Sequence, residues 1–132
     1  MTFQASHRYA HISARKLRLV ADLVRGRDVN QALDILRVTR KRASHFVSKL
    51  LKSAVANAAS RSEVQVNRLV VRRIWADGGP LVLGRLWWRP GAQGRVMPIR
   101  KRTAHLHVVL EERPEAPAPE KKKAAASRSA KE

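Results

Sequence analysis

The residues best suited to chemistry lie between positions 78 and 102, where arginines and tryptophans are interspersed with glycines and prolines and no acidic residue occurs. Arginine offers a planar fork of donors that fits a phosphate and also stacks on bases, and tryptophan can stack on a base or fill a gap in folded RNA. This combination indicates RNA contact. The candidate RNA-binding residues of the segment are Arg85, Trp87, Trp88, Arg89, Arg95, Arg100, Lys101 and Arg102.

The five histidines raise the question of a metal or catalytic site. His7 and His11 are four residues apart in a segment that we expect to be extended, and His105 and His107 share one face of an expected strand. Two such ligands do not make a metal site, and no cysteine or carboxylate completes either pair. The sequence also lacks a phosphate-binding loop, a nucleophile elbow and a carboxylate pair in an apolar setting. We therefore expect no metal, no cofactor and no enzymatic activity.

The net charge supports a polyanionic partner. The 132 residues include 28 Lys and Arg against 10 Asp and Glu, which gives +18 and a pI near 11.8. So large an excess repels itself in a compact state and is best tolerated when a polyanion neutralises it, although a basic protein with scattered charge is the simpler alternative. Residues 114–132 hold five Lys and Arg and three Glu, so +16 remains on residues 1–113.

Helical periodicity dominates the first half of the chain. We predict helices over residues 13–26, 28–39 and 41–61, the first capped by Ser13 and the second by a capping box of Asp28 and Gln31. The backbone N–H groups at a helix start favour phosphate, so the basic residues at the start of the first helix are further candidates for RNA contact. They are Arg15, Lys16 and Arg18.

Strands are predicted at residues 4–11, 64–76 and 104–111. One antiparallel three-stranded sheet with three helices on one face, an α+β two-layer body, is the simplest packing. We interpret residues 78–102, here called the arm, as a long protruding β-hairpin that reaches about 30 Å from the body. A disordered loop is the alternative. Residues 1–113 would form a single domain, and the Ala/Lys/Pro-rich residues 114–132 a disordered tail.

The chain offers no sign of a membrane partner, because no stretch approaches 18 consecutive apolar residues. Residues 1–20 lack acids and contain Arg and Ser, as organelle transit peptides do, but residues 12–26 fit an integral helix better. The absence of cysteine excludes disulfides and fits a reducing compartment.

Several short motifs, in their order and spacing, resemble the bacterial large-subunit ribosomal protein family uL22 over residues 7–111. The matching segments are Ser13-Ala14-Arg15-Lys16-Leu17-Arg18, Arg25-Gly26, Ser53-Ala54-Val55-Ala56-Asn57-Ala58, Asp77-Gly78-Gly79-Pro80, Arg89-Pro90-Gly91-Ala92-Gln93-Gly94-Arg95 and Lys101-Arg102-Thr103-Ala104-His105. The chain departs from the family pattern at Ala14, Gly91 and Ala104, and its segment 81–88 is longer than the pattern predicts.

The resemblance implies a non-catalytic constituent of the large ribosomal subunit in the cytoplasm, an organellar ribosome being the less favoured alternative. It implies that the chain binds large-subunit ribosomal RNA, contacts neighbouring ribosomal proteins and supports subunit assembly. It adds His105 to the RNA-binding candidates. It also implies that the hairpin tip lines the polypeptide exit tunnel and faces the nascent polypeptide. The tip residues are Arg89, Pro90, Gly91, Ala92, Gln93 and Gly94.

Two other classes of function remain open from the residues alone. A free-standing DNA- or RNA-binding regulator could use the same basic surface, and it would be a soluble dimer with a sequence preference. A membrane-active basic peptide is disfavoured, because the apolar stripes of the predicted helices suit a protein core.

Overall fold

The computed structural model of the chain describes residues 1–61 and 64–113, so the predicted tail lies outside the described residues. Along the chain a strand is followed by three helices and then by four strands. The elements are β1 (Thr2–Ala10), α1 (Ala14–Val24), α2 (Val29–Val38), α3 (Arg42–Ala59), β2 (Leu69–Leu81), β3 (Trp87–Pro90), β4 (Val96–Ile99) and β5 (Arg102–Glu112). Short 3₁₀ turns are η1 (Val66–Arg68), η2 (Val82–Gly84) and η3 (Ala92–Gly94).

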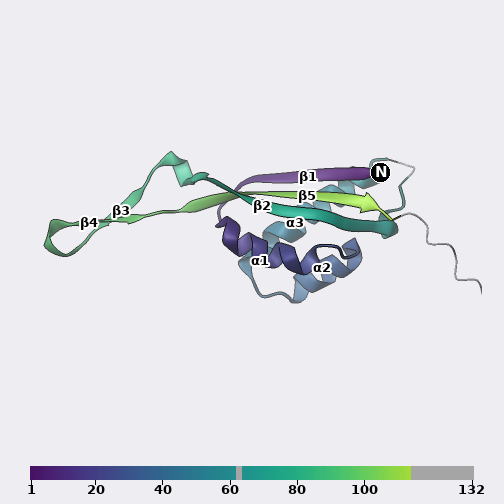
Figure 1. Cartoon of the computed structure of the whole chain (residues 1–132), viewed down its shortest axis with the longest axis horizontal. Helices are drawn as coiled ribbons and strands as arrows, with labels where there is room; N and C mark the ends of the chain where they lie inside the picture. Colours follow the sequence, from purple (N-terminus) through teal and green to yellow (C-terminus); the bar gives the residue numbers. More distant parts are fainter. Residues whose placement is uncertain (62–63, 114–132) are drawn as a thin grey trace, which may run out of the picture.

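The body is a three-stranded antiparallel sheet in the order β1-β5-β2, with the three helices on one side (Figure 1). From Ala104 to Leu110, strand β5 alternates, because Leu106, Val108 and Leu110 are fully buried against the helices while His105 and His107 point to the other side and are half-buried. The apolar stripes of α1 and α3 complete this core. The predicted two-layer α+β class is confirmed.

The helices start and end close to the predicted residues, but their caps differ from expectation. Ser13 and Asp28 occupy the two N-cap positions, yet neither side chain makes a capping hydrogen bond, so the predicted capping box is wrong. Asp28 instead forms an ion pair of 3.7 Å with Arg113 at the end of β5. Gly26 has φ +74° and ends α1 as predicted, since glycine adopts this left-handed conformation at little cost.

Strand β2 is shifted relative to the prediction of residues 64–76. It begins only at Leu69, where the partner Glu112 of β5 becomes available, and the preceding residues form η1. It then continues to Leu81 through a bulge after Gly78. At the bulge the Thr103 hydroxyl donates to the Pro80 carbonyl at 2.6 Å, and a Cβ on Gly79 would lie only 2.5 Å from that hydroxyl oxygen. Asp77-Gly78-Gly79-Pro80 therefore lies within β2 and carries the strand outward into the arm.

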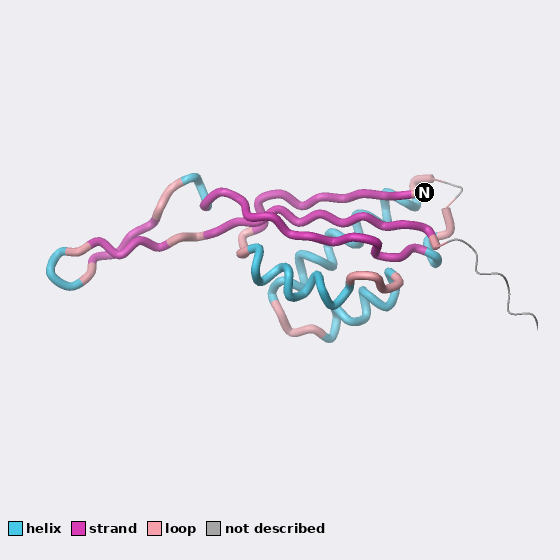
Figure 2. Tube along the Cα trace, in the orientation of Figure 1, coloured by secondary structure: helices cyan, strands magenta, loops and turns pink. Residues whose placement is uncertain are grey.

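The arm is a long hairpin that projects beyond the helices, as Figures 1 and 2 show. Its ladder is not continuous. Pairing stops after Leu81–Arg102 and resumes as the four-residue ladder of β3 and β4. Leu83 at φ 57° and Gly84 at φ +66° in η2 turn one side of the ribbon and break the register. No side chain from 78 to 102 is buried.

Candidate nucleic-acid interface

The outer half of the arm has two chemically different faces, because directly paired residues of an antiparallel ladder point to the same side. The pairs Trp87–Ile99 and Arg89–Met97 lie on one face, and Trp88–Pro98 and Pro90–Val96 on the other. The first face carries a cation at Arg89. The second has no charged side chain, and Trp88 is the more exposed tryptophan, at 66% against 41% for Trp87.

Two cations are held on the Trp87 ring. The Lys101 ammonium nitrogen lies 3.7 Å from the ring centroid, and the guanidinium carbon of Arg85 lies 5.9 Å from it. Such cation–π contacts contribute about 0.5–1 kcal/mol at exposed sites. Trp87 therefore gathers two of the predicted RNA-binding side chains into one cluster, while Trp88 makes no such contact among the described residues.

The hairpin turns where the sequence indicates, at the Pro90–Arg95 segment. The Gly91 amide donates to the Arg95 carbonyl at 2.7 Å and the Arg95 amide to the Ala92 carbonyl at 3.2 Å, which closes η3. Gln93 at φ 56° and Gly94 at φ +68° supply the left-handed steps that this turn requires. A Cβ at Gly91 would approach the Arg95 carbonyl oxygen to 3.1 Å, so glycine suits this position.

A hollow of about 300 Å³ lies where the arm leaves the body, and we call it the basic hollow. It lies between the start of α1, the start of α3 and the base of the arm at residues 100–102. Among the described residues no acidic side chain lines it, and Ser13 at the N-cap of α1 and Arg42 at the start of α3 bring the positive ends of two helix dipoles beside it. Its lining residues are His11, Ile12, Ser13, Lys16, Arg42, Arg100 and Arg102. This donor set is suited to bind phosphate.

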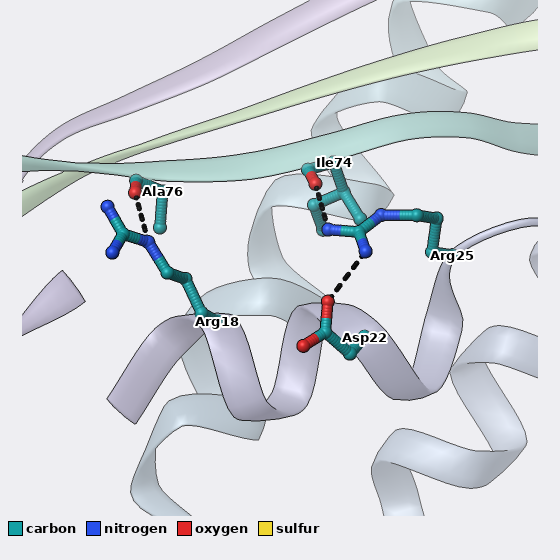
Figure 3. Close-up of polar contacts among 5 residues, drawn as sticks. All are labelled: Arg18, Asp22, Arg25, Ile74 and Ala76. Atoms are coloured by element: carbon teal, nitrogen blue, oxygen red, sulfur yellow. Dashed lines mark hydrogen bonds and ion pairs between the residues drawn. The ribbon is translucent and has the colours of Figure 1, made fainter. Parts of the chain in front are cut away.

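Arginines of α1 also serve the fold (Figure 3). The Arg18 Nε donates to the Ala76 carbonyl at 2.9 Å, and the Arg25 Nη2 donates to the Ile74 carbonyl at 3.0 Å. Arg25 is itself paired with Asp22 at 2.7 Å. These contacts satisfy carbonyls along the outer edge of β2, which would otherwise be a free sheet edge.

Comparison with known proteins places the chain in a family. The model of the family described as ribosomal protein L22p/L17e matches residues 5–111. The chain belongs to this family. It is 50% identical over 113 residues to the large ribosomal subunit protein uL22 of Bdellovibrio bacteriovorus, covering 86% of this chain and 100% of that protein. It is 52% identical over 109 residues to the uL22 protein of Caldicellulosiruptor saccharolyticus, covering 83% of this chain and 87% of that protein.

The family resemblance seen in the motifs is thereby confirmed. The chain is a structural constituent of the large ribosomal subunit, which is cytoplasmic, and it is not an enzyme. Within residues 1–61 and 64–113, no group of three or more His, Cys, Asp or Glu side chains is arranged to hold a metal ion. None of the helices in that same part of the chain has both the length and the apolar character needed to cross a membrane.

The predicted contact residues fall into distinct groups in the structure. Lys16 meets Arg100 and Arg102 in the basic hollow, and Arg85, Trp87 and Lys101 form the arm cluster. Six predicted residues lie apart from both groups, and two of them, Arg89 and Arg95, stand on either side of the η3 turn. Arg15 is exposed on α1, Arg18 is tied to β2, Trp88 lies on the uncharged face of the arm, and His105 lies on the sheet.

Two residues of the basic hollow were missed by sequence reasoning, Arg42 and His11. The basic run Arg40-Lys41-Arg42 was a usable signal, because Lys41 is the N-cap of α3 and Arg42 its first residue, as Ser13 is the N-cap of α1. Nothing in the sequence marks His11 as part of this hollow, because its neighbours in space come from α3 and from residues 100–102 at the base of the arm.

Proposed function

We propose that the chain binds large-subunit ribosomal RNA through one basic surface that runs from the basic hollow along the charged side of the arm. The supporting observation is the hollow itself, which joins body and arm by four cationic side chains with no acid among them. Releasing condensed counterions from RNA phosphates supplies much of the affinity. Specificity comes mainly from RNA shape, because the major groove of paired RNA is too narrow to be read.

In this proposal the arm inserts between RNA segments and supports subunit assembly, and its tip lines the polypeptide exit tunnel. Apart from Arg89, the tip carries no charged side chain, since residues 90–94 are all uncharged. This uncharged part suits a wall past which the nascent polypeptide slides, because it offers no ion pair to a passing residue. Arg89, the first residue of the tip, and Arg95, which follows the tip, bind RNA on either side of the uncharged part.

Contacts with neighbouring ribosomal proteins are proposed at a groove between α1 and the start of α3. Leu19, Leu23 and Ala43 line it, and Lys16 and Arg42 lie at its border with the basic hollow. Leu19 is 67% exposed, which is high for a leucine on a helix that otherwise packs against the sheet. An apolar segment of a protein bound beside the same RNA would cover it.

The test compares two triple variants of equal charge. Lys16→Ala/Arg42→Ala/Arg102→Ala removes cations of the basic hollow, and Arg40→Ala/Lys49→Ala/Lys52→Ala removes three exposed cations outside it. Filter binding to large-subunit rRNA at several salt concentrations should show the salt slope falling by about one unit per lost phosphate contact in the first variant. The control should lose less than one unit in total.

Equal losses in the two variants would contradict the proposed surface. Sedimentation of cell extract addresses the alternative of a free-standing regulator, because the proposed function requires the chain to remain with large subunits after a moderate salt wash. Recovery only in the low-mass soluble pool would contradict it.

A further inference from the structure

The face of the sheet that the helices leave uncovered, here called the open face, carries aromatic side chains from all three strands. Trp75 of β2 and His107 of β5 are cross-strand partners, and their rings stack with centroids 5.2 Å apart and planes 15° from parallel. Tyr9 of β1 meets His105 of β5 edge-on at 4.8 Å. Trp75 and Tyr9 are 40% and 51% exposed, so both rings face solvent in the free chain.

Part of this face is held in place by a backbone irregularity. A register shift between His7 and Ala10 of β1 accompanies a positive φ of 56° at Tyr9. The Tyr9 amide then donates to the His105 Nδ1 at 3.1 Å. A bulky residue with positive φ is uncommon, and such conformations concentrate at functional sites. The bulge turns an aromatic ring onto the open face that regular pleating would place elsewhere.

We propose that the open face is a second RNA-contact surface, on which the Trp75–His107 stack receives an unpaired base of ribosomal RNA. This inference rests on the proposed function, namely that the chain binds that RNA. The two rings are nearly parallel, so a base laid on the exposed side of Trp75 continues the stack. Sheets with exposed aromatic side chains bind unpaired bases in this way in other RNA-binding folds.

The charges around the stack favour RNA over an apolar protein segment. Arg73 lies on the same face two residues before Trp75, and the Arg8 guanidinium lies 5.4 Å from the Tyr9 ring centroid. Neither arginine forms an ion pair among the described residues, whereas Arg72 is neutralised by Glu111 at 3.0 Å. The exposed Asp77, which pairs with His105 on this face, offsets one of the two cations. The open face therefore keeps a net positive charge for the phosphates that flank an unpaired base.

A hollow of about 430 Å³ next to the stack can read the edge of such a base. Trp75 and His107 form part of its lining, and the remaining polar groups come from β1 and α3. Serine hydroxyls and side-chain amides both donate and accept hydrogen bonds, which the edge of every base requires. These polar lining residues are Gln4, Ser6, Ser53 and Asn57.

The first experiment uses the full chain with Trp87→Phe and Trp88→Phe, which leaves Trp75 as the only tryptophan. Its fluorescence is titrated with single-stranded decauridylate and with an RNA duplex of ten base pairs, and filter binding is measured in parallel. We expect quenching by the single strand and none by the duplex. Trp75→Leu in the wild-type chain should weaken single-strand binding about five- to hundredfold and leave duplex binding unchanged.

His107→Ala provides a second variant that keeps Trp75, with His45→Ala as its matched control because His45 is an exposed histidine on α3. His107→Ala should reduce the quenching and the control should not. Single-strand binding without any change in Trp75 emission would overturn this inference and leave the proposed function standing. Failure to bind either RNA would overturn both.

The second experiment identifies the partner in the assembled subunit. A photo-crosslinking amino acid replaces Ser6, which is exposed and pairs with His107 in the register of β1 and β5, so the stack itself stays intact. Irradiation of purified large subunits should join the chain to ribosomal RNA. A cross-link to another ribosomal protein with none to RNA would overturn the inference.

Discussion

The body and the arm carry similar side chains but use them differently. In the body, several cations find partners within the chain, as when Arg25 contacts Asp22 and the Ile74 carbonyl, or Arg72 contacts Glu111, while others such as Arg73 form no ion pair among the described residues. In the arm there is no acid at all, and the contacts of its cations with other side chains are those of Lys101 and Arg85 with the Trp87 ring. The body folds around its own core, and the arm, which has none, is built to be completed by another molecule.

The same difference holds for apolar side chains. Leu106 and Leu110 in the body part of β5 are fully buried, whereas Leu83, Trp88 and Val96 of the arm are each more than 60% exposed. A two-stranded ribbon with no face covered is marginal in water. Ribosomal RNA packed on both sides of the ribbon would supply the burial that the arm lacks.

Proteolysis should give the largest contrast. In the isolated chain we expect the first cuts between Leu83 and Arg95, because no side chain there is buried and the ladder is short. In assembled subunits the same bonds should be protected by at least about a hundredfold, since the arm is then enclosed. Timed digestion with mass spectrometry measures both rates. Equal protection in the two states would mean that the ribbon folds independently.

Two side-chain truncations, one in the body and one in the arm, should differ in their effect on the free energy of unfolding. Leu106→Ala removes a fully buried side chain from the central strand and should lower the free energy of unfolding by about 2–5 kcal/mol. Ile99→Ala in β4 should change it by less than about 0.5 kcal/mol, because that side chain is already exposed. Urea unfolding followed by circular dichroism tests this. A large loss from Ile99→Ala would mean that the arm contributes to the folded core.

These two regions also differ in how well the sequence predicts them. The body follows from periodicity, because the stripe Ala43, Val47, Leu50, Leu51 and Ala54 repeats at helical spacing and each of these side chains is buried as predicted. The start of β2 was misplaced because Val64 and Val66 have strand-forming side chains but no partner on β5 to pair with. The strand preference of single residues does not show where the partner strand β5 ends.

For the candidate interface, residue type predicted which side chains would be available but not which would meet. Lys16 and Arg102 are far apart in sequence and come together only because β5 leads back from the arm past the start of α1. Arg18 carries the same charge as Lys16, yet it lies two residues further along α1, about 200° around the helix, where it faces the backbone of β2. Residue type does not distinguish the two adjacent tryptophans, whereas the pleat of the strand places them on opposite faces.

Arg25→Ala tests whether cations of the body serve the fold. Removing the guanidinium leaves the Ile74 carbonyl at the edge of β2 without this donor, and we expect a loss of about 1 kcal/mol, since the side chain is half exposed. Arg40→Ala, at an exposed position before α3, should change the unfolding free energy by less than about 0.5 kcal/mol. Urea unfolding compares them. Equal effects would contradict a structural role for Arg25.

The smallest expected effect concerns the arm cluster. Lys101→Ala removes the ammonium 3.7 Å from the Trp87 centroid, and the lost cation–π contact is worth about 0.5–1 kcal/mol of local order. Global stability should not change, because no arm residue is buried, but the indole N–H resonance of Trp87 should shift toward its value in a flexible chain. Arg100→Ala is the matched control, since it removes an adjacent cation that lines the basic hollow and should leave that resonance in place. An unchanged Trp87 resonance in Lys101→Ala would mean that the cation–π contact does not order this part of the arm. The local structure of the arm would then depend on RNA alone.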